Sequence, residues 1–133
     1  MDAQLHEELF IKSFIRADRQ HRWAGLLPNP RRRSRFIHRL ADDSDLDERC
    51  FVTVPPSPNY VSVLELLRSM GAPDRCYLIS EVPGFDRTEM TLEEAVAQVF
   101  GSGMGTVISC LPGGLAYYEG EFRARVILRA GTK

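Results

Sequence analysis

The sequence predicts an α/β (or α+β) domain in which helices pack on a mixed sheet of about five strands. Two helical segments come first, β-rich runs then alternate with helical segments, and the C-terminal part consists of short β-rich runs joined by glycine turns. A chain of 133 residues has room for one hydrophobic core but not for two. We therefore expect one globular domain over residues 1–133, with residues 1–41 as a helical N-terminal segment and residues 49–133 as the sheet core.

The N-terminal segment is expected to hold two helices. Between Ala3 and Ala24 there is no proline or glycine, and apolar residues recur at helical spacing, which predicts one long amphipathic helix. Asn29 suits the N-cap of a second, shorter helix, Pro30 suits its first position, and the helix should end near Ala41. Because a helix of about 20 residues is long for so small a domain, exchange or dimerisation of the first helix with a second copy is a further possibility.

Alternating strands and helices are predicted in the middle of the chain. The β-rich runs lie at residues 49–54, 76–80 and 106–111. The first intervening helix should be capped by Ser57 or Asn59 and end at Gly71, and the second should open with a capping box of Thr91 and Glu94. This order predicts two or three βαβ-ordered parallel strands joined by right-handed crossovers.

A C-terminal antiparallel meander is expected to follow. Gly113 and Gly114 lie between two β-rich runs, which predicts a two-residue hairpin turn, and Gly120 suits a second tight turn. The alternating pattern of residues 122–129 predicts a last strand with one face in the core and the other mostly in water.

One face of this meander is a candidate recognition surface. It carries a hydroxyl, a tyrosine and two arginines: Ser109, Tyr118, Arg123 and Arg125. In the expected register Ser109 lies opposite Tyr118, and Tyr118 lies opposite Arg123. Tyrosine and arginine are enriched at protein interfaces. An alternative of equal weight is a half-exposed sheet face on which Tyr118 merely covers the stem of an arginine.

The glycine-rich segment "GSGMG", residues 101–105, raises the question of a phosphate-binding loop. A phosphate-binding loop leads from a strand into a helix, so that amide groups at the helix N-terminus point at the anion. Here the order is reversed, from helix to strand, and the lysine of a P-loop is missing. The segment is therefore predicted to form turns.

The N-terminal segment is rich in arginine. Eight arginines fall between Arg16 and Arg39, and Arg31, Arg32 and Arg33 occupy the first turn of the predicted second helix, where cations oppose the helix dipole. The acidic run at residues 42–48 could neutralise them through salt bridges, and we favour this partial neutralisation over a free anion-binding patch.

Little in the sequence predicts catalysis. The three cysteines are unclustered and odd in number, and the histidines show no metal-ligand spacing, so we expect no disulfide framework, metal or cofactor. A nucleophile pair of Cys110 or Ser109 with His38 is conceivable, but a cysteine inside a strand is usually buried and inert.

The most favoured function is a small non-enzymatic binding module, an adaptor, regulatory or immunity-like protein, with a protein partner or a second copy of itself. Its candidate binding residues are Arg31, Arg32, Arg33, Arg35, His38, Ser109, Tyr118, Arg123 and Arg125. The net charge of −1, the absence of a basic n-region and the absence of a long apolar stretch predict a cytoplasmic protein without membrane contact. The alternatives are a nucleic-acid or nucleotide binder that uses the arginine-rich helix, and a small hydrolase or transferase built on Cys110 or His38.

Overall fold

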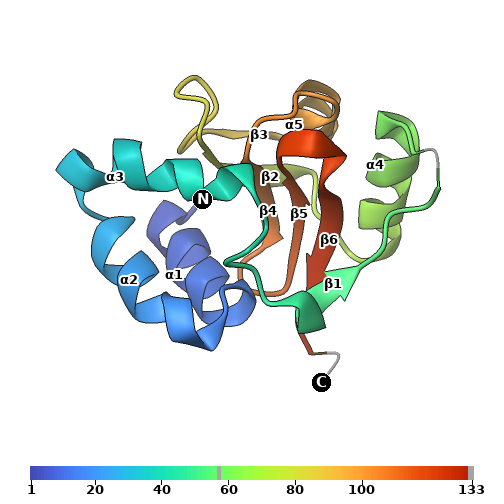
Figure 1. Cartoon of the computed structure of the whole chain (residues 1–133). Helices are drawn as coiled ribbons and strands as arrows, with labels where there is room; N and C mark the ends of the chain where they lie inside the picture. Colours follow the sequence, from blue (N-terminus) through green and yellow to red (C-terminus); the bar gives the residue numbers. More distant parts are fainter. Residues whose placement is uncertain (57, 132–133) are drawn as a thin grey trace.

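A six-stranded sheet with helices on both faces forms the protein (Figure 1). The computed structural model describes residues 1–56 and 58–131. The helices are α1 (Ala3–Phe14), α2 (Gln20–Leu26) and α3 (Pro30–Phe36) on one face, and α4 (Tyr60–Ser69) and α5 (Leu92–Val99) on the other. The strands are β1 (Phe51–Val52), β2 (Arg75–Ser80), β3 (Glu89–Thr91), β4 (Thr106–Leu111), β5 (Leu115–Glu119) and β6 (Arg125–Arg129). The fold is therefore mixed α and β, as expected.

The strand directions differ from the expectation. The strand order is β1-β6-β5-β4-β2-β3, and every pair of neighbours is antiparallel. The predicted parallel crossover from β2 to β4 is therefore wrong, whereas β1 and β2, the two strands that α4 joins, are parallel although they are not neighbours in the sheet. The cause is β3, a three-residue strand that the sequence analysis missed. It folds back on β2 before α5 begins, so the chain enters β4 in the opposite direction to β2.

The long N-terminal helix is interrupted. After Phe14 the chain becomes extended at Ile15, which forms an isolated antiparallel bridge with Leu46, and the short 3-10 helix Ala17–Arg19 leads into α2. Both Ile15 and Leu46 are buried, so burial of these side chains outweighs continuation of the helix. α1 packs on β2 and β4 of its own chain, which gives it a docking site without a second copy.

The predicted helix starts are confirmed where the structure describes them. The Asn29 side chain accepts hydrogen bonds from the N–H groups of Arg31 and Arg32, and Pro30 opens α3. Asn59 caps α4 in a capping box, and Thr91 caps α5. The alternative cap, Ser57, lies outside the described residues.

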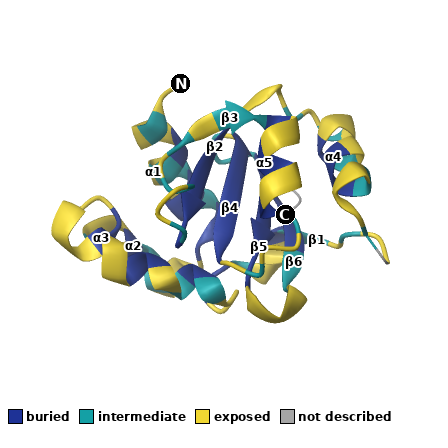
Figure 2. Ribbon diagram, turned by 90° about the horizontal axis from the view of Figure 1, so that it is seen from above, coloured by how far each residue is buried: buried dark blue, intermediate teal, exposed yellow. Residues whose placement is uncertain are grey.

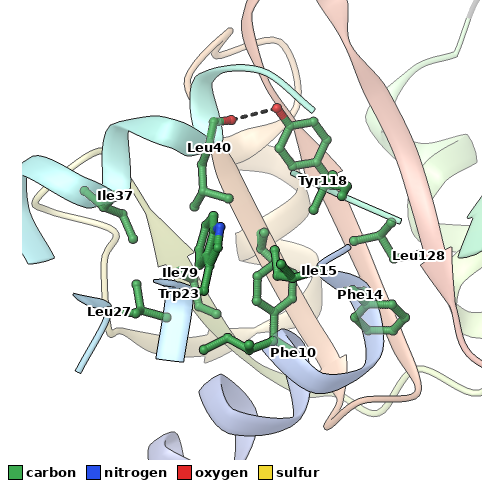
Figure 3. Close-up of a cluster of buried hydrophobic side chains, with 14 of the residues drawn as sticks. Phe10, Phe14, Ile15, Trp23, Leu27, Ile37, Leu40, Ile79, Tyr118 and Leu128 are labelled. Atoms are coloured by element: carbon green, nitrogen blue, oxygen red, sulfur yellow. Dashed lines mark hydrogen bonds between the residues drawn. The ribbon is translucent and has the colours of Figure 1, made fainter. Parts of the chain in front are cut away.

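Both faces of the sheet are buried (Figure 2). Tyr118 and its neighbours on one face of β5 pack against the N-terminal helices, in a cluster that includes Phe10, Phe14 and Trp23 (Figure 3). The side chain of Tyr117, the residue before Tyr118, points to the opposite face of the sheet and packs against α4 and α5. The expectation of a sheet face in water is therefore wrong.

The register of the meander also differs from the expectation. Ser109 pairs with Ala116, while Tyr118 pairs with Val107 and Val126. The hairpin loop has three residues between Leu111 and Leu115, where a two-residue turn was predicted, and the β4–β5 ladder shifts again between Ser109 and Leu111. The second turn is longer than expected, since a 3-10 turn (Glu121–Arg123) precedes β6. As a result Phe122 is 96% exposed and does not belong to a core face.

Close backbone contact holds the helical layer against one end of the sheet. A Cβ atom at Gly105 would lie 2.3 Å from the carbonyl carbon and oxygen of Leu40, in the 3-10 helix Ile37–Ala41 that follows α3. Tyr118 strengthens the same junction by donating a hydrogen bond from its hydroxyl to the Leu40 carbonyl, at 2.6 Å (Figure 3). Glycine is therefore required at position 105.

This contact predicts that Gly105→Ala destabilises the protein by about 2–3 kcal/mol, because the added methyl group meets rigid backbone. Urea denaturation measures the change. The matched control is Gly84→Ala, where a Cβ would meet no atom within 4 Å, and its stability should change by less than about 0.5 kcal/mol. Equal stability of the two variants would contradict the proposed contact.

Candidate functional site

Arginines gather in a groove between α2 and α3. We call it the arginine groove; its volume is about 590 Å³, and it is lined by Arg22, Leu26, Arg31, Arg32, Ser34, Arg35, Phe36 and Arg39. Sequence analysis placed three of these arginines in a candidate site and missed Arg22 and Arg39. Both residues belong to the run of arginines from Arg16 to Arg39, which is the sequence feature that could have indicated them.

Local sequence explains how the groove is built. The Asn29 cap and Pro30 start α3 just before Arg31, and residues four apart on a helix share a face, so Arg31 and Arg35 are neighbours. Trp23 of α2 packs edge-on against Phe36 of α3, with ring centroids 4.9 Å apart. This aromatic contact joins the two helices that carry the arginines.

Most of the groove's positive charge is not neutralised. Arg22, Arg31, Arg32 and Arg35 are exposed, and within residues 1–56 and 58–131 no salt bridge to them is found. A cluster of guanidinium groups without carboxylate partners favours binding of an anion.

Arg39 is the groove arginine that the acidic run does neutralise. It makes a bidentate pair with Asp45, which also accepts a hydrogen bond from the Trp23 indole at 2.9 Å. Burial opposes the charge of Asp45, but the hydrogen bonds from Arg39 and Trp23 outweigh it and hold the pKa of this carboxyl below its usual value. The expected neutralisation by the acidic run therefore occurs at Arg39 and, through Asp45, at Arg19 outside the groove. Among the described residues it does not occur at Arg31, Arg32 or Arg35, where the expectation is wrong, and Asp47 pairs with Arg49.

Arg33 does not belong to the groove. It is 5% exposed and points into the protein, where it pairs with Glu7 at 2.6 Å and in a bidentate manner with Asp86 at 2.8 Å. Burial opposes its charge, but hydrogen bonds to Asp86 and Glu7 outweigh this effect and raise the pKa of Arg33. Its prediction as a surface binding residue is wrong, because two carboxylates distant in sequence hold it inside.

The predicted sheet surface does not form. Ser109 and Tyr118 are buried under the N-terminal helices, and Ser109 Oγ lies 2.6 Å from His6 Nδ1. Arg123 is exposed on the β5–β6 turn, whereas Arg125 is half-buried, pairs with Glu119 and stacks over the Phe100 ring. Ser109 and Tyr118 face the N-terminal helices, whereas Arg125 lies over Phe100 beside the cluster on the opposite face, so the four side chains form no common exposed surface.

Cys110 and His38 do not form a nucleophile pair. Cys110 lies in the cluster covered by α4 and α5, and burial raises the pKa of its thiol. His38 follows α3 on the other face, with its Nδ1 3.1 Å from Glu81 Oε1. In the described ranges there is also no group of three or more His, Cys, Asp or Glu side chains that could hold a metal ion.

The glycine-rich loop does surround an anion, but the anion is a carboxylate of the same chain. Glu119, which is fully buried, accepts hydrogen bonds from the N–H groups of Gly101 at 3.1 Å and Gly103 at 3.0 Å. The Tyr117 hydroxyl and the Arg125 guanidinium also donate to it. The loop amides are thus used to stabilise the fold, which agrees with the prediction of turns.

A second concave site lies between α1, α2 and the turn that joins β2 to β3. We call it the α1–α2 cavity; its volume is about 630 Å³ and it has both apolar walls and charged groups, among them Glu7, Ile11, Leu27, Tyr77 and Arg87. Sequence analysis missed this cavity. Its residues come from separate segments, and no local motif connects them.

Comparison of the chain with models of known protein families, with curated proteins and with solved structures finds no match. Across the described residues, no helix has the length and apolar character that crossing a membrane requires. Function must therefore be argued from the concave sites of the protein, of which the arginine groove and the α1–α2 cavity are two.

The buried carboxylate predicts a stability effect. Glu119→Gln should destabilise the protein by about 2–4 kcal/mol, because Arg125 loses its buried partner and the loop amides lose a charged acceptor. Guanidinium chloride denaturation measures the loss. Glu121→Gln, at an exposed position two residues away, is the control and should leave stability nearly unchanged; a loss of the same size there would contradict the assigned role of Glu119.

The cysteines give a chemical prediction. The side chains of Cys50, Cys76 and Cys110 are buried, and burial raises the pKa of the Cys76 thiol to about 12. Because the thiolate is the reactive form, a disulfide reagent such as dithionitrobenzoate should modify none of them within minutes in the folded protein, and all three in denaturant. Rapid modification of Cys110 in the folded state, located by peptide mapping, would instead support a nucleophilic role.

Proposed function

We propose that this chain is a small non-enzymatic binding module that recognises a protein partner through the arginine groove. The partner chemistry that fits best is an acidic segment with an apolar side chain. The observation that supports the proposal is a set of four arginines around one concave surface that have no carboxylate partner among the residues that the structure describes.

The apolar part of the groove favours a peptide over a nucleic acid. Leu26, which is half-buried, lies among the arginines, and Phe36 adds the small part of its side chain that is not buried in the core, so the surface offers both charge and an apolar contact. Interfaces between proteins combine arginine with apolar and aromatic contacts in this way. A sugar-phosphate backbone would use the charges and leave the apolar contact unused.

Negative charge close to the groove also works against a long polyanion. Asp42 lies near enough to influence Arg39, and the whole chain has a net charge of −1. A nucleic acid that extended beyond the groove would meet this negative charge, whereas a short acidic peptide would not.

Charge reversal tests the proposal. The probe is a fluorescein-labelled peptide of alternating aspartate and leucine, and binding is followed by fluorescence anisotropy. Arg31→Glu combined with Arg35→Glu should weaken binding at least tenfold, a change of about 1.4 kcal/mol or more. The matched control reverses two exposed arginines outside the groove, Arg68→Glu with Arg129→Glu, and should retain most of the affinity.

A single-stranded DNA of mixed sequence serves as the competing probe at the same salt concentration. Tighter binding of the DNA, lost in the groove variant, would replace the peptide proposal with the nucleic-acid alternative. Equal loss of peptide affinity in the groove variant and its control would show that binding follows overall charge, and would contradict a groove-specific function.

A further inference from the structure

Arg87 has a backbone conformation that its side chain disfavours. It ends the turn between β2 and β3 with φ of 61°, and its N–H donates to the Leu78 carbonyl at 2.9 Å. A left-handed conformation is disfavoured for residues with a Cβ atom and is the usual place for glycine. Unfavourable backbone conformations that persist in a fold are frequent at binding sites.

The Arg87 side chain lines the α1–α2 cavity. Among residues 1–56 and 58–131 its guanidinium has no carboxylate partner within salt-bridge distance, and its charge acts on Tyr77 at the base of the cavity. Lys12, a second cation of the lining, likewise has no salt bridge within these ranges. Two cations at the cavity are thus available to an anionic ligand.

The cavity also offers a hydrogen-bond acceptor. Glu7 accepts from Arg33 through Oε1 and from the Tyr77 hydroxyl through Oε2. A carboxylate has about four acceptor sites, so Glu7 can accept one or two further hydrogen bonds. The charge of Glu7 is balanced by Arg33, which is itself shared with Asp86.

Apolar side chains also line the cavity between these polar groups. Ile11, Ala24 and Leu27 contribute to them, and the other charged or titratable groups in the lining are Glu8, which accepts from Gln4, and His21. A cavity of 300–1,000 Å³ with apolar walls and a few placed polar groups is typical of small-molecule sites. At about 630 Å³ this cavity lies within that range.

We propose that the α1–α2 cavity binds a small organic anion whose apolar body carries a hydrogen-bond donor. The positive charges of Arg87 and Lys12 attract the acid group. The apolar body packs on Ile11 and Leu27, and the donor bonds to Glu7. This site is separate from the arginine groove and does not depend on the function proposed for it.

Three related compounds test the ligand chemistry by isothermal titration calorimetry. The probe 3-(4-hydroxyphenyl)propanoate has both the acid and the donor and is expected to bind. Removing the hydroxyl, in 3-phenylpropanoate, should weaken binding several-fold. Replacing the acid by an amine, in tyramine, should abolish it; tyramine that bound as well as the acid, or failure of both acids to bind at millimolar concentration, would overturn the proposal.

The variant Arg87→Gly tests the residue. It removes the guanidinium and relieves the left-handed conformation, so the melting temperature should rise while affinity for the hydroxyphenyl acid falls at least tenfold. The matched control is Arg123→Gly, since Arg123 is also an exposed arginine with φ of 61° but does not line the cavity. It should also melt at a higher temperature, with unchanged affinity.

A second variant tests the same site without altering the turn. Lys12 lies on an exposed surface of α1, and the substitution Lys12→Gln should weaken binding of the hydroxyphenyl acid several-fold. Unchanged affinity in Arg87→Gly, or the same loss in Arg123→Gly, would overturn the proposal.

Discussion

The buried guanidinium of Arg33 is the interaction on which the helical side of the protein depends. Its two carboxylate partners come from α1 and from the turn between β2 and β3, so one side chain joins three segments. A buried charge that loses one partner costs about 3–5 kcal/mol, which makes alternative placements of α3 unfavourable. Because Arg33 points inward, its helix neighbours Arg31, Arg32 and Arg35 are directed to solvent, and the arginine groove follows from this orientation.

Other buried carboxylates fix the loops at one end of the sheet. Glu119 accepts from the glycine-rich loop, and Glu81 accepts from the N–H of Gly105 at the end of that loop. Oriented backbone amides of this kind bind phosphate in many nucleotide-binding proteins. In this protein the chain supplies the anion itself, so the loop contributes to the stability of the fold.

Both concave sites share α2 as a wall. Arg22 and Leu26 line the arginine groove, while Gln20, His21 and Ala24 line the α1–α2 cavity. Trp23, on the inner side of the same helix, packs against Phe36 and donates a hydrogen bond to Asp45. A seven-residue helix of this kind has little stability of its own, so its placement, and with it the shape of both sites, depends on contacts of the buried tryptophan.

The sequence by itself determined the features that depend on near neighbours along the chain. The caps at Asn29, Asn59 and Thr91, the β-rich runs and the turns of the glycine loop all arise from interactions within a few residues, and together they predicted the mixed α and β class. Only the tertiary structure decided the strand directions, the burial of both sheet faces and which arginines remain free. These features depend on distant partners, since Arg33 meets Asp86 across 53 positions and His6 meets Ser109 across 103. A local sequence pattern cannot predict such pairs, because each pair forms only where the fold buries the two groups together and each then needs the other as a hydrogen-bond or charge partner.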